Sequence, residues 1–145
     1  MKQNNIGEFG EQFTQFFHQP KEAIKYLKRV KRGECIAAMY RSDIGNIDIP
    51  WGEVTSQEKH TGFGLAHIID KHGADIKALG FEVEDFIPII IQLGDLVLSK
   101  NSNRYVLESK QFRIVIARDC KGVSKNWLLT TFNLKKKPKA RKPSA

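Results

Sequence analysis

The last third of the chain constrains the fold most, because it contains three β-type runs separated only by short polar turns. The runs are Tyr105 to Ser109, Phe112 to Arg118 and Trp127 to Leu134, and their β-branched and aromatic composition is typical of strands. Connections this short join antiparallel neighbours. The sequence therefore predicts an antiparallel meander whose apolar face other elements must cover.

Side chains alternate between the two faces of such a sheet. The middle run has an apolar set on one face, which we expect to be the core: Phe112, Ile114 and Ile116. Strict alternation in the last run places Thr130 and Thr131 on opposite faces. We expect the face away from the core to present Arg113, Thr131 and Lys110 to a ligand.

Helical spacing of apolar residues in the first third predicts a short helix through Phe13 to Phe17 and a longer one that begins near Pro20 and ends before Gly33. Residues 34–53 favour a β-hairpin around Gly45. Residues 61–80 predict a third helix with a break near Gly73. Residues 82–100 begin as a helix and end as a strand, with the boundary left open.

This order of elements predicts an α+β fold, with N-terminal helices packed on a roughly four-stranded antiparallel β-sheet. A chain of 145 residues suffices for one ordinary core, so we expect a single domain over residues 1–134. The formal net charge is +8, and six cations lie in "KKKPKARKPSA", so residues 1–134 carry 8 − 6 = +2. We expect this tail, residues 135–145, to be disordered, and either to solubilise the protein or to attract phosphate without specificity.

Several protein classes are disfavoured by the sequence. The longest apolar run, around Phe86 to Leu93, is far shorter than the roughly 20 residues of a membrane span. The first residues lack a secretory signal, so we expect a cytoplasmic site of action, in the producing cell or in a target cell. Cys35 and Cys120 are far apart, which argues against a structural metal site or a disulfide framework.

The stretch "GLAHIIDKHG", residues 64–73, gathers three proton-handling side chains in an apolar helical segment: His67, Lys71 and His72. On a helix His67 and Lys71 lie one turn apart and share a face. His72 lies near the expected helix end, where the helix dipole favours a cation. Each histidine therefore has a structural interpretation as well as a catalytic one.

Zinc binding by this stretch would need a further ligand, which Asp70, Glu53 or His60 could supply. The chain has neither an H-E-x-x-H motif nor a closely spaced cysteine pair. We therefore expect no metal and no cofactor.

The stretch "TGFGLAHIIDKHG", followed by a strand-rich half that closes with "NWLLTTFNL", resembles the barnase, EndoU, colicin and RelE-like nuclease superfamily, in particular its phage and polymorphic-toxin branches. The resemblance covers residues 35–134. It implies helices on a four-stranded antiparallel sheet and a metal-independent ribonuclease, often a toxin domain. The matching positions are His67, Lys71, His72, Thr130 and Thr131.

The chemistry that this resemblance implies suits these residue types. Cleavage of RNA through its own 2'-hydroxyl needs a base, an acid and donors to the phosphate. The resemblance implies that His67 and His72 divide the proton transfers, and that Thr130 or Thr131 offers a hydroxyl. Charge stabilisation and substrate binding fall to Lys71, Arg113 and Lys110. Because the 2'-hydroxyl is the nucleophile, the products carry 2',3'-cyclic phosphate ends and DNA is spared.

Two other functions remain open on the sequence alone. A non-catalytic RNA- or protein-binding module would use the basic tail and the sheet face. A transferase acting on a nucleotide cofactor would need a phosphate loop, and no glycine-rich loop of the usual form is present. For the ribonuclease we expect RNA as the partner, with transfer, messenger and ribosomal RNA all open, no membrane, and a cognate acidic immunity protein or antitoxin.

Overall fold

The computed structural model describes residues 5–97 and 99–134, so the predicted tail at 135–145 lies outside the described residues. The helices are α1 (Pro20–Val30), α2 (Gly64–Ala78) and α3 (Val83–Leu93). The strands are β1 (Ile6–Gly7), β2 (Gly10–Phe13), β3 (Glu34–Arg41), β4 (Gly45–Pro50), β5 (Glu53–Ser56), β6 (Thr61–Phe63), β7 (Asp95–Val97), β8 (Arg104–Glu108), β9 (Phe112–Cys120) and β10 (Val123–Asn133).

The main sheet has eight strands in the order β1-β2-β3-β4-β10-β9-β8-β7. Strands β8 to β10 form the antiparallel meander that the C-terminal pattern predicts, and β7 pairs with β8 at its outer edge. The α+β class is confirmed, and the expected size of about four strands is wrong, because β1 to β4 extend the sheet beyond β10. Two strand pairs are parallel, β2 with β3 and β4 with β10. Strands β5 and β6 form a separate two-stranded ribbon.

The two halves of the main sheet meet at one residue pair, Trp127 with Asp48. A buried charge cluster reinforces this joint: Lys125 Nζ lies 2.9 Å from Glu34 Oε1 and 2.5 Å from Asp48 Oδ2. Glu34 is fully buried, and its other oxygen accepts a hydrogen bond from Gln12 Nε2 at 3.2 Å. One lysine thus links β10 to both strands of the β3–β4 hairpin.

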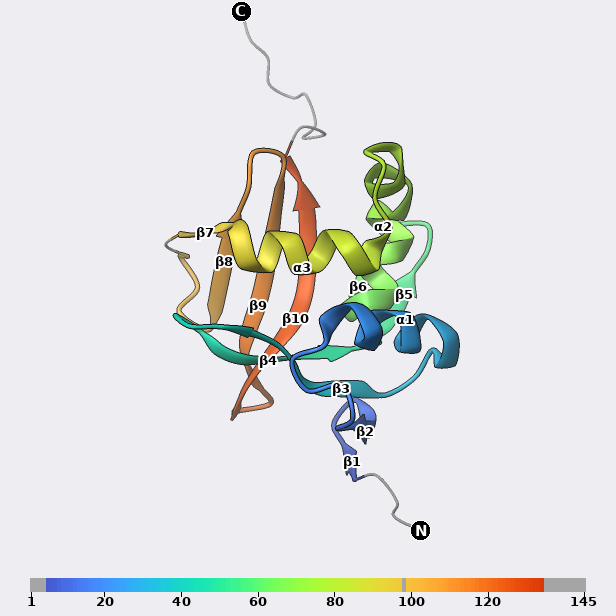
Figure 1. The fold of residues 1–145 in the computed structure, drawn as a ribbon, viewed down its shortest axis with the longest axis vertical. Coiled ribbons are helices and arrows are strands. Elements are labelled where there is room, and N and C mark those ends of the chain that lie inside the picture. The colour runs from blue at the N-terminus through green and yellow to red at the C-terminus, as the bar shows by residue number, and fades with distance from the viewer. Residues whose placement is uncertain (1–4, 98, 135–145) are drawn as a thin grey trace, which may run out of the picture.

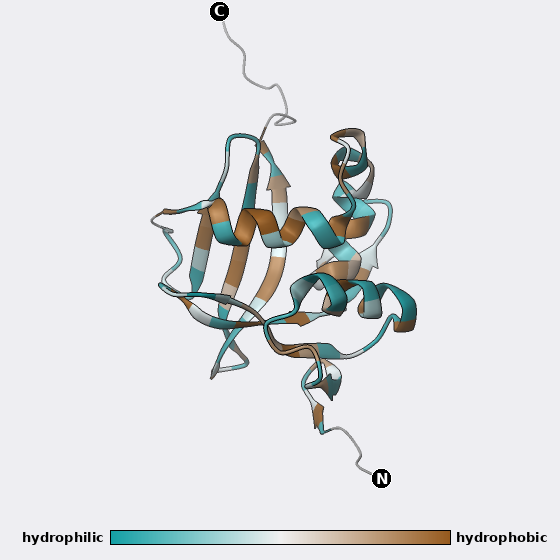
Figure 2. Cartoon of the chain, viewed as in Figure 1, coloured by the Kyte–Doolittle hydropathy of each residue, from teal (hydrophilic) through white to brown (hydrophobic). Residues whose placement is uncertain are grey.

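The helices supply the apolar cover for one face of the sheet. In Figure 1, α3 crosses the strands of the meander, α1 lies over β3, and α2 stands beside β10. In Figure 2 much of α3 is brown, as are stretches of the strands β8 to β10 that it crosses. The largest buried cluster draws on all three helices and includes Ile24, Leu27, Ile68, Ile76, Ile87, Ile91, Ile114, Ile116 and Leu128. In the described part of the chain, none of the helices has the length and apolar character to cross a membrane.

The predicted short helix through Phe13 to Phe17 is wrong. Gly10 adopts φ of +99°, which favours glycine and ends a helical path, and β1 and β2 pair through Gly7 and Gly10 instead. Phe13 then pairs in parallel with Cys35 of β3. Pairing with a distant strand therefore overrides the local helical spacing of the phenylalanines.

Helix α2 runs without interruption from Gly64 to Ala78, so the predicted break near Gly73 is absent. An internal glycine costs a helix only about 1 kcal/mol relative to alanine. Ile68 and Ile76, on either side of Gly73, are fully buried in the core, and this packing holds the helix together. Helix α3 likewise continues through Pro88.

Strand β10 contains a bulge that changes which side chains face the core. Leu128 pairs with Ile116, whereas Thr130 pairs with Val115, so Leu129 is an extra residue. After the bulge, Thr131 pairs with Ile114 on the core side and is fully buried. The expectation that Thr131 is presented to a ligand beside Arg113 is therefore wrong.

Candidate active site between helix α2 and strand β10

Helix α2 runs beside β10 in the same direction. At its start, the Phe63 ring lies 6.1 Å from the Trp127 ring. One turn from its end, Asp75 Oδ2 lies 3.3 Å from Asn133 Nδ2. This side of β10 is an open edge beyond Trp127, because β4 pairs with β10 only there. We call this boundary, residues 63–75 against residues 127–133, the α2–β10 seam.

His67 lies within the seam. His67 and Lys71 lie four residues apart and so form one stripe of α2, while Phe63 ends β6 immediately before the helix. Phe63 faces the start of β10, and Lys71 Nζ lies 5.5 Å from the Phe132 ring centroid near the strand's end. His67 lies one helical turn before Lys71, on the same face of α2.

The His67 side chain is buried, with 5% of its surface exposed. Its Nδ1 atom is buried and has no hydrogen-bond partner among the described residues. Burial, then the Lys71 cation and His72, lower the pKa of His67 below its ordinary value of 6.5. A neutral imidazole with an unpaired nitrogen is a competent proton acceptor at neutral pH.

His72 lies on a different side of the same helix. Five residues turn its side chain about 140° from that of His67 on an uninterrupted helix. Its ring meets Phe112 edge-on, with centroids 6.2 Å apart, and its Nδ1 lies 3.4 Å from Asp75 Oδ2. Burial lowers the pKa of His72 although the Asp75 carboxylate opposes this shift. The structure thus places His67 and Lys71 on one face of α2, whereas His72 packs against Phe112 and Asp75 and lies beside the Thr131 backbone of β10.

The two buried histidines predict a pH dependence of stability. Their pKa values are lower in the folded protein than the ordinary 6.5, so the unfolded chain takes up protons first as the pH falls. The free energy of unfolding should therefore be constant above about pH 7 and decrease as the pH falls through 6.5 towards 5. Urea unfolding at several pH values measures this. The variant His67→Gln/His72→Gln should lose the dependence in that range, and a wild-type protein equally stable at pH 7 and 5 would contradict it.

The threonines and Arg113 are held by neighbouring strands. The Thr131 hydroxyl donates to the Arg113 carbonyl at 2.7 Å and so braces β10 against β9. Thr130 pairs with Val115 on the sheet face opposite the core, and its Oγ1 lies 3.4 Å from the Thr131 carbonyl. The Arg113 guanidinium forms an ion pair with Glu108, with Nε 2.9 Å from Oε2.

Lys110 lies in the turn between β8 and β9 and is exposed. It borders a hollow whose other wall is the C-terminal half of α3, including Ile89 and Leu93. Its position therefore suits a role on an outer surface better than one inside the seam.

The sequence analysis did not predict the hydrogen-bonded contact between His60 and Asp70. His60, in the turn between β5 and β6, places Nδ1 3.1 Å from Asp70 Oδ2 of α2. The Asp70 charge acts on His67 in the direction that raises its pKa. His60 and Asp70 are possible zinc ligands by residue type, and within the described residues no group of three or more histidine, cysteine or acidic side chains is suited to a metal.

Comparison with known proteins gives one match. The family model described as phage-Barnase-EndoU-ColicinE5/D-RelE like nuclease 1 matches residues 38–138. This range contains all of α2 and β10, and therefore the whole seam. The comparisons with curated proteins and with solved structures give no match.

Proposed function

We propose that this chain, which belongs to the phage-Barnase-EndoU-ColicinE5/D-RelE like nuclease 1 family, is a metal-independent endoribonuclease with its active site at the α2–β10 seam. The family match confirms the resemblance of residues 35–134 to that superfamily. The observation that carries the choice of site is the pairing on one face of α2 of a buried imidazole with a lowered pKa, His67, and an exposed cation, Lys71, within the residues that the family model matches. A neutral imidazole beside a cation suits a reaction in which one group accepts a proton and the other offsets negative charge on a phosphate.

In this proposal His67 accepts the proton of the RNA 2'-hydroxyl. The 2'-oxygen then forms a bond to the adjacent phosphorus, and the bond from phosphorus to the 5'-oxygen breaks. One product ends in a 2',3'-cyclic phosphate, and the other begins with a 5'-hydroxyl after receiving a proton. The lowered pKa of His67 favours its neutral, proton-accepting form at neutral pH.

The departing 5'-oxygen receives its proton from Lys71 in this geometry. Lys71 shares the stripe of α2 with His67 and is exposed beside the Phe132 ring. Its ammonium also offsets negative charge on the phosphate. His72 is assigned the positioning of α2, through the contact of its ring with Asp75, which also contacts Asn133 of β10.

The other predicted site residues have supporting roles in this proposal: some contact the substrate, and Thr131 keeps β10 in place against β9. Thr130, on the sheet face opposite the core, offers a hydroxyl to a phosphate oxygen, while Thr131 fixes the strand that carries it. Arg113 and Lys110 extend the binding surface along the RNA backbone. The net charge of +8 favours association with a polyanion.

We propose further that the ribonuclease is a toxin domain. A ribonuclease that acts in the cytoplasm endangers the cell that makes it, so we propose a cognate acidic inhibitor that covers the seam. The basic character of the chain supports an acidic partner. Transfer RNA is one candidate substrate beside messenger and ribosomal RNA.

Cleavage of RNA in excess chelator tests the proposed reaction. We expect fragments with 2',3'-cyclic phosphate and 5'-hydroxyl ends. An oligonucleotide with a single 2'-deoxy residue on the 5' side of the cut position should resist cleavage there, because it lacks the nucleophile. Cleavage of the deoxy-substituted bond at the same rate would reject the mechanism, and binding without cleavage would favour the non-catalytic module.

A further inference from the structure

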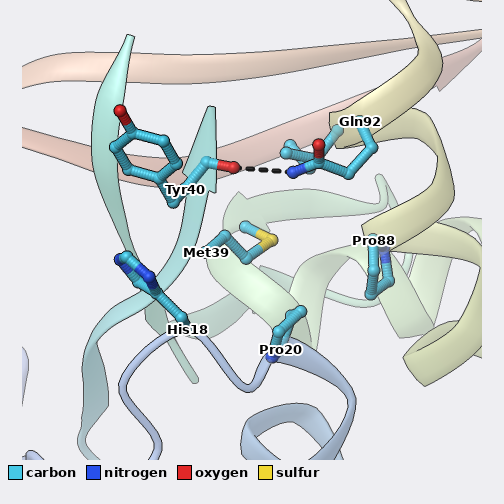
Figure 3. Close-up of a pocket in the computed structure, with 7 residues that line it drawn as sticks. His18, Pro20, Met39, Tyr40, Pro88 and Gln92 are labelled. Carbon is cyan, nitrogen blue, oxygen red and sulfur yellow. Dashed lines mark hydrogen bonds between the residues drawn. The ribbon is translucent and has the colours of Figure 1, made fainter. Parts of the chain in front are cut away.

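A second concave site lies on another part of the molecule, between the start of α1, the end of β3 and α3. It is a cavity of about 240 Å³ whose lining includes His18, Met39, Tyr40 and Pro88. In Figure 3 the His18 and Tyr40 rings lie on one side, Pro88 and Gln92 on the other, and the Met39 side chain between them. The proposed reaction at the seam makes no use of this cavity.

The walls of the cavity are fixed before any ligand arrives. Gln92 Nε2 donates to the Tyr40 carbonyl at 2.6 Å, as Figure 3 shows. Arg41 Nη1 donates to the carbonyls of Ile91 and Gly94 at 2.8 and 2.6 Å. The C-terminal half of α3 is thereby attached to β3. A preformed site loses little conformational entropy when it binds.

His18 is held in place by an unusual backbone. Its φ is +56°, and its N–H donates to the carbonyl of Ala37, whose own φ is +52°. Left-handed conformations are uncommon outside glycine and cluster at functional sites. The His18 Nε2 atom lies 2.8 Å from Asn46 Oδ1. Backbone and side-chain contacts therefore fix the orientation of the imidazole ring.

Aromatic rings form a ladder along this edge of the cavity. The Phe17 ring stacks on His18 with centroids 3.7 Å apart and planes 16° apart, and the Tyr40 ring follows at 5.2 Å. Phe17 is 55% exposed and Tyr40 46% exposed. Exposed rings in series are the platform on which single-stranded nucleic acids stack their bases.

The lining also indicates what the occupant lacks. The described side chains that line the cavity include no lysine, arginine, aspartate or glutamate, so the cavity offers no fixed countercharge to a phosphate or carboxylate. Its volume of about 240 Å³ is below the roughly 300 to 1,000 Å³ of pockets for drug-sized ligands. A neutral, flat ring system is the occupant that fits this chemistry.

We infer that the cavity formed by His18, Met39, Tyr40, Pro88 and Gln92 binds one unstacked nucleobase of the RNA, away from the cleaved bond. This inference rests on the proposed function for the identity of the polymer. It adds a specificity site to a nuclease whose seam contacts only sugar and phosphate in the proposed reaction. Proline walls and aromatic rings would select bases by shape and stacking.

Methionine labelling tests occupancy directly, because the chain has only Met1 and Met39. In the full-length protein with ¹³C-methyl methionine, an eight-nucleotide 2'-O-methyl RNA should shift the Met39 methyl resonance and leave Met1 unchanged. The 2'-O-methyl group removes the nucleophile, so no cleavage interferes. An abasic sugar-phosphate oligomer of equal length should leave Met39 unshifted, since it has the charge but no bases.

The affinity of variants for the same RNA, measured by fluorescence anisotropy, tests whether Tyr40 and His18 contribute to binding. Tyr40→Ala should weaken binding between about 5- and 150-fold, the range expected for loss of stacking on one base. His18→Asn, which tolerates the left-handed backbone, should also weaken it. Tyr105→Ala is the matched control, because Tyr105 lies on β8 beneath Arg118, and it should bind like wild type. Circular dichroism checks that each variant is folded.

The outcomes separate this inference from the proposed function. An unshifted Met39 methyl, or equal affinity in Tyr40→Ala and wild type, overturns the nucleobase site even if RNA is cleaved in chelator. A shifted Met39 methyl with reduced affinity in Tyr40→Ala supports the site even if no cleavage is seen, and the ribonuclease proposal then fails alone.

Discussion

Replacing His67 by glutamine is expected to lower the rate of RNA cleavage by roughly 10²- to 10⁴-fold, the usual contribution of a positioned general base. Glutamine is close to histidine in size and retains hydrogen-bonding atoms, but it cannot carry a proton between reactants. Because His67 is 5% exposed, a size-conserving change limits the cavity left in the seam. Single-turnover cleavage at saturating RNA measures the effect on the chemical step.

The neighbouring histidine supplies the matched comparison. His72→Gln should retain most of the cleavage rate if Lys71 is the acid, and its main effect should be on stability, since His72 contacts Asp75 and Phe112. A large loss of rate in a folded His72→Gln variant would restore the division of proton transfer between two histidines. Wild-type cleavage by folded His67→Gln would remove His67 from the mechanism.

Replacing Lys125 by methionine is expected to destabilise the protein by about 3 to 5 kcal/mol, the cost of removing one partner from a buried ion cluster. The change leaves the fully buried Glu34 and the nearby Asp48 without their shared cation. Burial opposes the charge on Lys125, but the hydrogen bonds to Asp48 and Glu34 prevail and hold its pKa above the ordinary 10.5. This stabilisation is therefore present below pH 10.5 and lost as the pH rises through the folded pKa. Urea unfolding at neutral pH measures the loss.

Lys121 provides the control for Lys125 on the same hairpin. Its ion pair with Glu8 is solvent-exposed, with 79% and 52% of the two side chains accessible, so Lys121→Met should have little effect on stability. Adding Glu34→Gln to Lys125→Met should recover part of the lost stability, because it removes a buried charge and keeps an acceptor for Gln12. Equal stability of Lys125→Met and Lys121→Met would show that the cluster does not hold the two halves of the sheet together.

Local pattern was sufficient for a large part of the fold. The meander β8 to β10 and helix α1 could be predicted because alternation and helical spacing are properties of short segments. The same holds for the resemblance to the nuclease family, which rests on two contiguous stretches. His67 and Lys71 could be placed on one helix face for the same reason.

The strand that pairs with the outer side of β10 could not be predicted from local pattern. Strand β4 joins β10 through a single pair, Trp127 with Asp48, and nothing in either segment alone specifies that partner. The buried contact of Lys125 with Glu34 likewise connects residues 91 positions apart, by the difference 125 − 34. Such pairings depend on the summed packing of many segments, and they enlarge the sheet from four strands to eight.

The family, the meander and the helix that carries His67 each depend on residues close together in the chain, so the sequence was sufficient to predict them. The arrangement of the candidate site depends instead on how distant segments pack. The bulge at Leu129 turns Thr131 into the core, and burial of Ile68 and Ile76 keeps α2 continuous through Gly73. His72 therefore stays on a different side of α2 from His67. The physical reason is that register and helix continuity are set by which surfaces are buried together, and a local pattern does not specify its partner.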